Sequence, residues 1–213
     1  EFSVIEHNLN SITFSLTSSA RTLQHFPFLF TLQVKYTLMD NQLTVDFKIE
    51  NKDEKRMLFS YGWHPGFNLN WIPNDTIDNY YLAFPENETL SRIPVTPEGL
   101  LENTLQPFEV NDNKTYSLNR ESFKERAIVL EDYPYSEISL RHIHSQKSID
   151  LRFENFPHLT LWGQPSANFI CLEPWHGLGD FVDHKNKLQD KKGILKLPKE
   201  QIHSSQISLT LKN

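Results

Sequence analysis

Hydrophobic and polar residues alternate along most of this chain. Residues 43–49, LTVDFKI, carry Leu, Val, Phe and Ile at every second position. A period of two is typical of a β-strand that buries one face. The segments with this pattern, or with a short apolar run, are residues 2–5, 11–17, 28–38, 43–49, 57–61, 80–84, 127–130, 137–143, 148–154, 159–162, 169–172, 194–197 and 206–211. They predict about a dozen strands and an all-β protein.

Few segments of the chain favour a helix. Residues 117–126 could hold a helical turn and are the one helix candidate. Residues 72–122 contain several prolines and many polar residues. Without helices to cover them, the strands should form stacked antiparallel sheets, that is, a large antiparallel β-sandwich. We expect residues 1–213 to form a single domain, with residues 72–122 as a long excursion whose loops could wall a site.

Two short segments carry the candidate chemistry. Residues 169–172, FICL, predict a buried strand that delivers Glu173 and ends at the next residue, a proline without an N–H to donate to a sheet. Far upstream, residues 61–69, YGWHPGFNL, place His64 directly before another proline. Each segment thus ends a strand with one ionisable side chain.

His64 and Glu173 are a candidate acid and base. A histidine gives or takes a proton near neutrality. Glu173 adjoins apolar residues and Trp175, so burial should raise its pKa and make it a better base. We expect the pair to face each other across one sugar ring and to open and reclose a cyclic hemiacetal without metal or cofactor. Taken singly, His64 could be an ordinary loop histidine, and Glu173 could cap a strand or pair with a basic residue.

The two segments together resemble one protein family. FICLEPW followed by a glycine-containing turn, with GWHPGFNL upstream, is similar to the aldose 1-epimerases, or galactose mutarotases. The HP-x-F-N motif and CLEPWHG resemble most the LacX-like branch, and the likeness covers nearly the whole chain, including DNYYLAF. The resemblance implies a galactose mutarotase-like supersandwich that interconverts the anomers of a free hexose. It also implies His64 as general acid and Glu173 as general base.

The resemblance implies further sugar-binding residues. In the family an acidic residue of a later loop contacts sugar hydroxyls, and the nearest match is Glu125 in FKERAIVL, where aspartate is typical. The family also uses an arginine and a histidine upstream of the HP-x-F-N motif. His7, His25 and Arg21 do not stand in the matching context. We therefore expect that this chain, which begins without methionine, lacks the N-terminal portion of the family.

Aromatic side chains near the two motifs could offer flat faces to a pyranose. Trp63 and Trp175 are the candidates for such contacts, and His176 could also reach the sugar. Each of the three could instead pack in the core or lie on the surface. For Trp162, within HLTLWG, core packing is the expectation.

Composition argues against several other partners. The formal net charge is −6 and the sequence pI is about 5.8, with no basic stripe, which argues against nucleic acid and anionic membranes. No apolar run approaches the roughly 18 residues that a membrane span needs. The single cysteine, Cys171, cannot form an internal disulfide, which fits a reducing cytoplasm. A small sugar is the expected partner, bound by a monomer or a homodimer.

Two other functions compete with this interpretation. His142 and His144 alternate in LRHIHS and could bind zinc or iron in a jelly-roll enzyme, but only Asp150 stands where a glutamate is expected. Strand histidines that face solvent are the preferred account of this motif. A non-catalytic sugar-binding or regulatory domain could also use the same sandwich. Such a domain needs aromatic faces and hydrogen bonds but no opposed acid and base.

Overall fold

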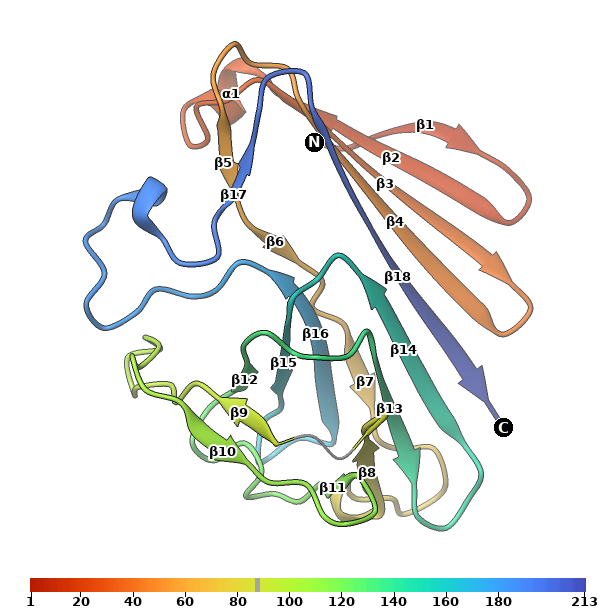
Figure 1. The fold of residues 1–213 in the computed structure, drawn as a ribbon. Helices are drawn as coiled ribbons and strands as arrows, with labels where there is room; N and C mark the ends of the chain where they lie inside the picture. Colours follow the sequence, from red (N-terminus) through yellow and green to blue (C-terminus); the bar gives the residue numbers. More distant parts are fainter. Residues whose placement is uncertain (87–88) are drawn as a thin grey trace.

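The computed structural model describes residues 1–86 and 89–213, whose regular secondary structure is almost entirely antiparallel strands (Figure 1). The largest sheet has nine strands in the order β1-β2-β3-β4-β18-β14-β13-β8-β11. Its strands are β1 (Ser3–His7), β2 (Ser11–Thr17), β3 (Phe30–Met39), β4 (Gln42–Asn51), β8 (Tyr80–Ala83), β11 (Thr115–Ser117), β13 (Glu137–His142), β14 (Ser148–Glu154) and β18 (Ile202–Lys212). The last strand of the chain thus lies between β4 and β14.

A second sheet has five strands and carries both candidate motifs. Its order is β12-β15-β16-β6, and β7 also pairs with β16. The strands are β12 (Ile128–Leu130), β15 (His158–Trp162), β16 (Phe169–His176), β6 (Tyr61–Gly62) and β7 (Gly66–Asn68). Two small ladders pair β5 (Met57–Phe59) with β17 (Leu195–Leu197) and β9 (Leu90–Arg92) with β10 (Gln106–Phe108).

Helical segments in the described residues are single turns. They are α1 (Ala20–Leu23), η1 (Ile77–Asn79) and η2 (Leu188–Asp190). Ser19 caps α1, because its side chain accepts from the N–H of Thr22. In the part of the chain that the structure describes, no helix has the length and apolar character that crossing a membrane requires.

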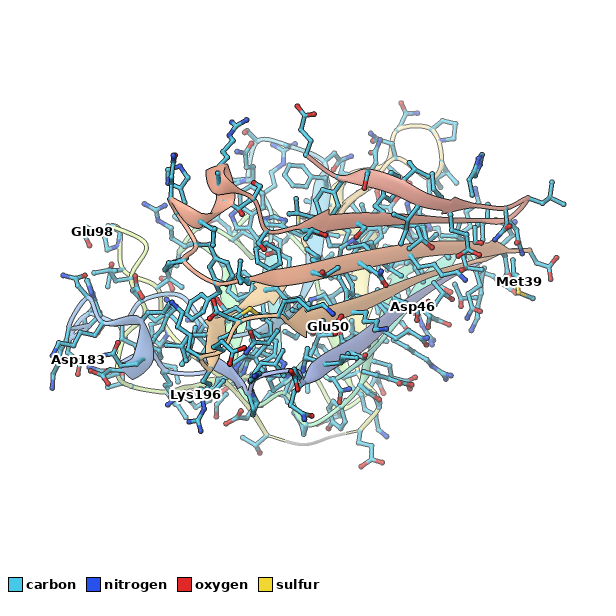
Figure 2. All side chains as sticks on the ribbon, turned by 90° about the horizontal axis from the view of Figure 1, so that it is seen from above. Met39, Asp46, Glu50, Glu98, Asp183 and Lys196 are labelled. Carbon is cyan, nitrogen blue, oxygen red and sulfur yellow. The ribbon has the colours of Figure 1, made fainter. Side chains whose placement is uncertain are left out.

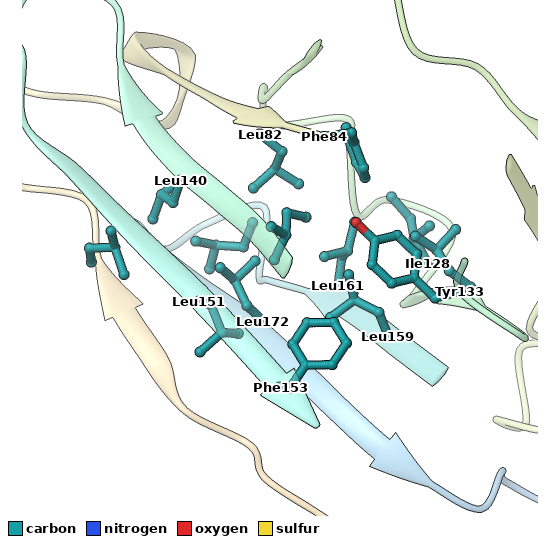
Figure 3. Packing of buried hydrophobic residues seen from close by; sticks show 14 of the residues in the cluster. Leu82, Phe84, Ile128, Tyr133, Leu140, Leu151, Phe153, Leu159, Leu161 and Leu172 are labelled. Carbon is teal, nitrogen blue, oxygen red and sulfur yellow. The ribbon is translucent and has the colours of Figure 1, made fainter. Parts of the chain in front are cut away.

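The main core lies between the two sheets. Leu140 and Leu151 of the nine-stranded sheet belong to the same buried cluster as Leu159 and Leu172 of the five-stranded sheet. Figure 3 shows these side chains packed together between the strands. Burying one such side chain contributes about 1.5–3 kcal/mol. This contact therefore holds the five-stranded sheet, and the candidate site on it, against the rest of the sandwich.

The predicted alternation of buried and exposed residues is confirmed in the nine-stranded sheet. In β4, Val45, Phe47 and Ile49 are buried, whereas Lys48 is exposed. All residues of β1, at the edge of the sheet, are exposed. In Figure 2, Met39 at the β3–β4 turn lies at the opposite end of the molecule from Asp183. An all-β sandwich, as predicted, is what the structure contains.

The helix candidate at residues 117–126 does not form a helix. The segment forms successive turns. In one of them the backbone N–H of Lys124 donates to the backbone carbonyl of Glu121. Side chains of the segment also bond to its backbone. The N–H of Glu121 donates to Asn119 Oδ1, and the N–H of Asn119 donates to Ser122 Oγ. Such local bonds from asparagine and serine compete with helix formation.

The predicted end of a strand at Pro174 is also wrong. β16 continues through Pro174 to His176, and Leu159 of β15 pairs with the proline. Pro174 has no N–H, but its carbonyl accepts from the N–H of Trp63 at 3.1 Å. The N–H that a proline lacks would point to the same side as this carbonyl, toward residues 63–65 between β6 and β7, so neither named ladder loses a bond.

Replacing Leu140 with alanine should lower the free energy of unfolding by about 2–5 kcal/mol, because a cavity replaces a fully buried side chain. Leu140 is 0% exposed and Leu38 is 58% exposed, so Leu38→Ala is a matched control. The control should change the free energy by no more than about 0.5 kcal/mol. Urea unfolding measures both, and equal losses in the two variants would contradict this location of the core.

Candidate active site

β16 presents Cys171, Glu173 and Trp175 on the face of the five-stranded sheet that points away from the main core. Successive side chains of a strand point to opposite faces. Ile170 and Leu172 are buried in the main core. Cys171, Glu173 and Trp175 therefore share the other face, which we call the site face.

His64 reaches the site face from the gap between β6 and β7. β6 pairs with the end of β16 through Gly62 and Trp175, and β7 pairs with its beginning through Gly66. The register is the same on both sides of the gap, which puts His64 directly opposite Glu173. Their side chains meet, with 3.4 Å between His64 Nδ1 and Glu173 Oε1.

The two partners differ in exposure and therefore in chemistry. The side chain of Glu173 is 2% exposed and that of His64 is 59% exposed. Burial raises the pKa of Glu173 to about 7, which outweighs the opposite effect of a hydrogen bond that Trp175 Nε1 donates to Oε2 at 3.1 Å. The carboxyl group thus changes charge near neutrality, as a general base at physiological pH requires. The expected effect of burial on this group is confirmed.

Two indole rings border the pair. Trp162 lies edge-on to His64, with 5.8 Å between ring centroids. Trp162 pairs with Cys171 and so shares the site face, which makes the prediction of core packing for Trp162 wrong. Trp175 crosses over Gly62, where a Cβ would lie only 2.6 Å from its Cδ1. The indole can pack there because residue 62 is a glycine and has no side chain.

The site face also carries a buried hydroxyl that the sequence did not single out. Thr160 of β15 pairs with Glu173 and is 1% exposed. Its Oγ1 is the one buried side-chain polar atom, among the residues described, without a hydrogen-bond partner. Leaving a buried hydroxyl unpaired costs about 1–3 kcal/mol, and such atoms call for a functional explanation. A threonine inside a strand gives no sequence signal by which it could have been found.

Cys171 lies beside His64 and Glu173 on the site face. Donor atoms of His64, Cys171 and Glu173 all lie within 4.8 Å of one another. Burial raises the pKa of the Cys171 thiol to about 11, and the charge of Glu173 acts in the same direction. The thiol is therefore neutral at physiological pH and is a poor nucleophile.

The predicted geometry of the pair is wrong in one respect. The sequence led us to expect His64 and Glu173 on opposite sides of a pocket, with a sugar ring between them. The structure brings them into direct contact on the same face. Residues opposite each other in adjacent strands have Cβ atoms only about 5 Å apart, which leaves no room for a ring. A sugar has to meet both groups from one side.

Two predicted sugar contacts, Trp63 and His176, point away from the site face. Each adjoins a site-face residue in the sequence, and neighbours along a strand face opposite ways. Trp63 packs against the main core. His176 stacks on Tyr61, and its Nδ1 lies 3.1 Å from the carbonyl oxygen of Asn155. The structure therefore brings neither residue to His64 and Glu173. Of the predicted aromatic contacts, it brings Trp175 there.

Glu125, which the family resemblance implied as a sugar contact, does not lie beside His64 and Glu173. Its side chain is 81% exposed, and its Oε2 is 3.5 Å from Arg92 Nη2. Both residues line a cavity that does not include His64 or Glu173. The structure thus gives Glu125 an ion pair at the surface and does not join it to the pair.

The rival metal candidate belongs to a buried hydrogen-bond network. His142 is 2% exposed, and its Nε2 lies 3.0 Å from Asp75 Oδ1. Its Nδ1 accepts from the N–H of His144, so Nε2 carries the proton toward Asp75. Tyr80 donates to the other oxygen of Asp75 at 2.5 Å. The prediction of a solvent-facing histidine is correct for His144, which is exposed, and wrong for His142.

The fold and the pair define a class: a two-sheet β-sandwich with a buried glutamate in contact with a histidine on its outer face. Comparison with known proteins gives the family. The family model described as Aldose 1-epimerase matches residues 1–193. Protein LacX of Lactococcus lactis subsp. lactis, in its plasmid and chromosomal forms, is 34% identical over 201 residues, which are 92% of this chain and 67% of LacX. The chain belongs to the aldose 1-epimerase family and is LacX-like, as the resemblance implied.

Solved structures agree with this assignment. A galactose mutarotase related enzyme from Lactobacillus acidophilus superposes with a TM-score of 0.92 at 29% identity, over 100% of this chain and 71% of that one. A galactose mutarotase-like protein from Lactobacillus casei gives a TM-score of 0.91 at 28% identity, over 100% and 73% of the two chains. The sandwich described above is thus the galactose mutarotase-like fold.

Replacing Glu173 with glutamine should change how stability depends on pH. The pKa of the folded state, about 7, lies above the ordinary 4.5. The folded protein therefore binds this proton more tightly than the unfolded chain, and stability falls as pH rises from about 4.5 to 7, by about 3 kcal/mol in all. Glu173→Gln should gain up to that amount over the wild type at pH 8. Urea unfolding should show the gain fade toward pH 4.5, and an equal gain at both pH values would contradict the buried, titrating carboxyl.

Proposed function

We propose that this chain acts as an aldose 1-epimerase that interconverts the α and β anomers of a free hexose. One observation carries the proposal: the carboxylate of Glu173, buried and with a pKa of about 7, touches the exposed ring of His64 at 3.4 Å. Membership of the aldose 1-epimerase family supports the same reaction. The acid and the base it needs are both in this contact.

Side-by-side placement suits the atoms that react. In a pyranose, the anomeric hydroxyl oxygen O1 and the ring oxygen O5 are bonded to the same carbon, C1. A base at O1 and an acid at O5 must therefore stand close together. Glu173 and His64 meet this requirement from one side of the sugar, which approaches where the imidazole is exposed.

The reaction then runs through the open-chain aldehyde. Glu173 takes the proton of O1 while protonated His64 gives a proton to O5, and the C1–O5 bond breaks. After rotation about the C1–C2 bond, the O5 hydroxyl attacks the other face of the carbonyl. His64 takes back its proton from O5 and Glu173 returns its proton to O1. Both side chains end as they began, so the chemistry consumes no cofactor.

The neighbours of the pair have supporting roles in this scheme. Trp175 Nε1 holds one oxygen of Glu173, which fixes the carboxylate and leaves the oxygen nearer His64 to act on the substrate. The hydroxyl of Thr160, opposite Glu173 and unpartnered, can bond a hydroxyl of the sugar. The ring of Trp162 beside His64 offers an apolar edge.

An unphosphorylated sugar fits the charge of the chain. The net charge is −6, and the side chains of Trp162 and Trp175, which border the pair, are uncharged. We therefore propose a neutral free hexose as the substrate. The reducing cytoplasm expected from the single cysteine stays a prediction.

Replacing Glu173 with glutamine should lower kcat by roughly 10²–10⁴, because the base is lost. Sugar affinity should change little, since glutamine keeps the shape of the side chain and the acceptor for Trp175. Polarimetry of freshly dissolved α-glucose and α-galactose measures turnover, and NMR titration measures affinity. Glu98→Gln alters an exposed glutamate and is the matched control, with activity retained.

The same measurements address a second candidate function, a non-catalytic sugar-binding or regulatory domain. The low exposure of Glu173, 2%, favours this alternative because a sugar must reach a largely covered carboxylate. Equal loss of turnover and affinity in Glu173→Gln would argue for binding without catalysis. So would a wild-type chain that binds a hexose without speeding its mutarotation.

The rate should also depend on pH in a defined direction. Glu173 is a base only when ionised, and its pKa is about 7. We expect kcat/KM to fall about tenfold for each pH unit below pH 6. Polarimetry from pH 5 to 8, with the buffer-catalysed rate subtracted, gives the profile. A rate that stays flat from pH 5 to 7 would exclude ionised Glu173 as the base.

A further inference from the structure

We infer that His64, Cys171 and Glu173 form a binding site for one divalent cation of the zinc class, and that the bound cation blocks the acid/base pair. Cation binding follows from the geometry of the three side chains. The block of catalysis rests in addition on the proposed function.

The donor set favours zinc over harder cations. An imidazole nitrogen, a thiolate sulfur and a carboxylate oxygen are the ligands of zinc sites, whereas magnesium and calcium prefer oxygen alone. The three donor atoms lie within 4.8 Å of one another, and they form the one such cluster within residues 1–86 and 89–213. The site needs no residue from another chain.

The distances suit a tetrahedral ion. Zinc bonds of about 2.0–2.3 Å put neighbouring ligand atoms about 3.3–3.8 Å apart. His64 Nδ1 and Glu173 Oε1 are already 3.4 Å apart. The other two separations, at most 4.8 Å, both involve the sulfur and would have to close by no more than about 1.3 Å. Rotation of the exposed imidazole can bring His64 nearer to the sulfur, and side-chain rotation of Cys171 can bring the sulfur nearer to Glu173.

The site face leaves room beside the sulfur. Gly66 pairs with Cys171 across the sheet, and a Cβ at Gly66 would lie 3.7 Å from Cys171 Sγ. Because glycine stands there, the space next to the sulfur is not filled by a side chain. The imidazole of His64, 59% exposed, faces solvent and gives a cation a route in.

A fourth ligand has a place as well. Three protein ligands leave one position of a tetrahedral zinc ion for water or another oxygen. The Thr160 hydroxyl, buried and unpartnered opposite Glu173, can accept a hydrogen bond from a water held there. This atom is an observation independent of the three donors, and it also points to a polar group bound at this face.

Binding and catalysis exclude each other. When the cation binds, the Cys171 thiol gives its proton to solvent, Glu173 binds as carboxylate and His64 binds through a neutral imidazole. The lone pairs that would take a proton from O1 and carry one to O5 are then used by the metal. Mutarotation should stop while the cation is bound and resume when a chelator removes it.

Cobalt is the probe for the site, because Co²⁺ replaces Zn²⁺ and reports its ligands in the absorption spectrum. Titration of the reduced chain with CoCl₂ should give a thiolate-to-cobalt charge-transfer band that ZnCl₂ abolishes. Cys171→Ser should lose the band, and both Cys171→Ser and His64→Ala should weaken zinc binding at least about tenfold. Since the His64 ring is largely exposed, His64→Ala tests the site even if the cysteine variant folds poorly. His25→Ala, which removes another exposed histidine, should match the wild type.

The outcomes separate the two parts of the inference. Absence of the charge-transfer band, or zinc affinity unchanged in both site variants, would overturn the metal site. With the band present, polarimetry with and without ZnCl₂ should show at least a tenfold loss of rate that EDTA reverses and MgCl₂ does not cause. Undiminished mutarotation by the zinc-loaded protein would overturn the proposed inhibition, whereas the metal site itself would stand. A chain without mutarotase activity under any condition would contradict the proposed function, and the cobalt spectrum would still decide the metal site.

Discussion

The site depends on the register in which β6 and β7 pair with β16. Gly62 and Gly66 fix that register on either side of His64. A shift by one residue would turn His64 to the core face and bring Trp63 to the site face, because side chains alternate with a period of two. The register is in turn held by the core, where Leu172 of β16 packs with residues of the large sheet. Hydrophobic packing on one face of β16 thus sets the distance between His64 and Glu173 on the other.

That arrangement explains why a costly group is kept in the sheet. Glu173 stands between two apolar strand neighbours and is nearly inaccessible, so its charged form is disfavoured. The same burial makes the carboxylate basic enough to take a proton near neutrality. Thr160, beside it, leaves a hydroxyl unpaired. Two unfavourable polar groups in adjacent strands indicate a face that is shaped for a ligand as well as for stability.

The sequence predicted the strands and the pairing of His64 with Glu173. It did not predict on which face of the sheet the neighbouring residues lie. Alternation in β4 revealed its buried face, because that strand has one apolar and one polar side. β16 is largely apolar on both faces, so its periodicity could not tell which neighbours of Glu173 share its side. Trp63 and His176 were predicted at the site for their closeness in sequence, and alternation puts them on the other face. The distance within the pair follows from strand register, which one sequence does not give.

Two histidine–carboxylate contacts in this chain show which feature makes such a pair chemically useful. His142 and Asp75 are closer, at 3.0 Å, than His64 and Glu173, at 3.4 Å. In the first pair both side chains are at most 2% exposed, and both ring nitrogens of His142 already have partners. That pair can stabilise the fold but has no access to a substrate. In the second pair burial tunes the carboxylate while the imidazole stays open to solvent. Of the two pairs, the second therefore combines a carboxylate whose pKa burial has raised with an imidazole that a ligand can reach.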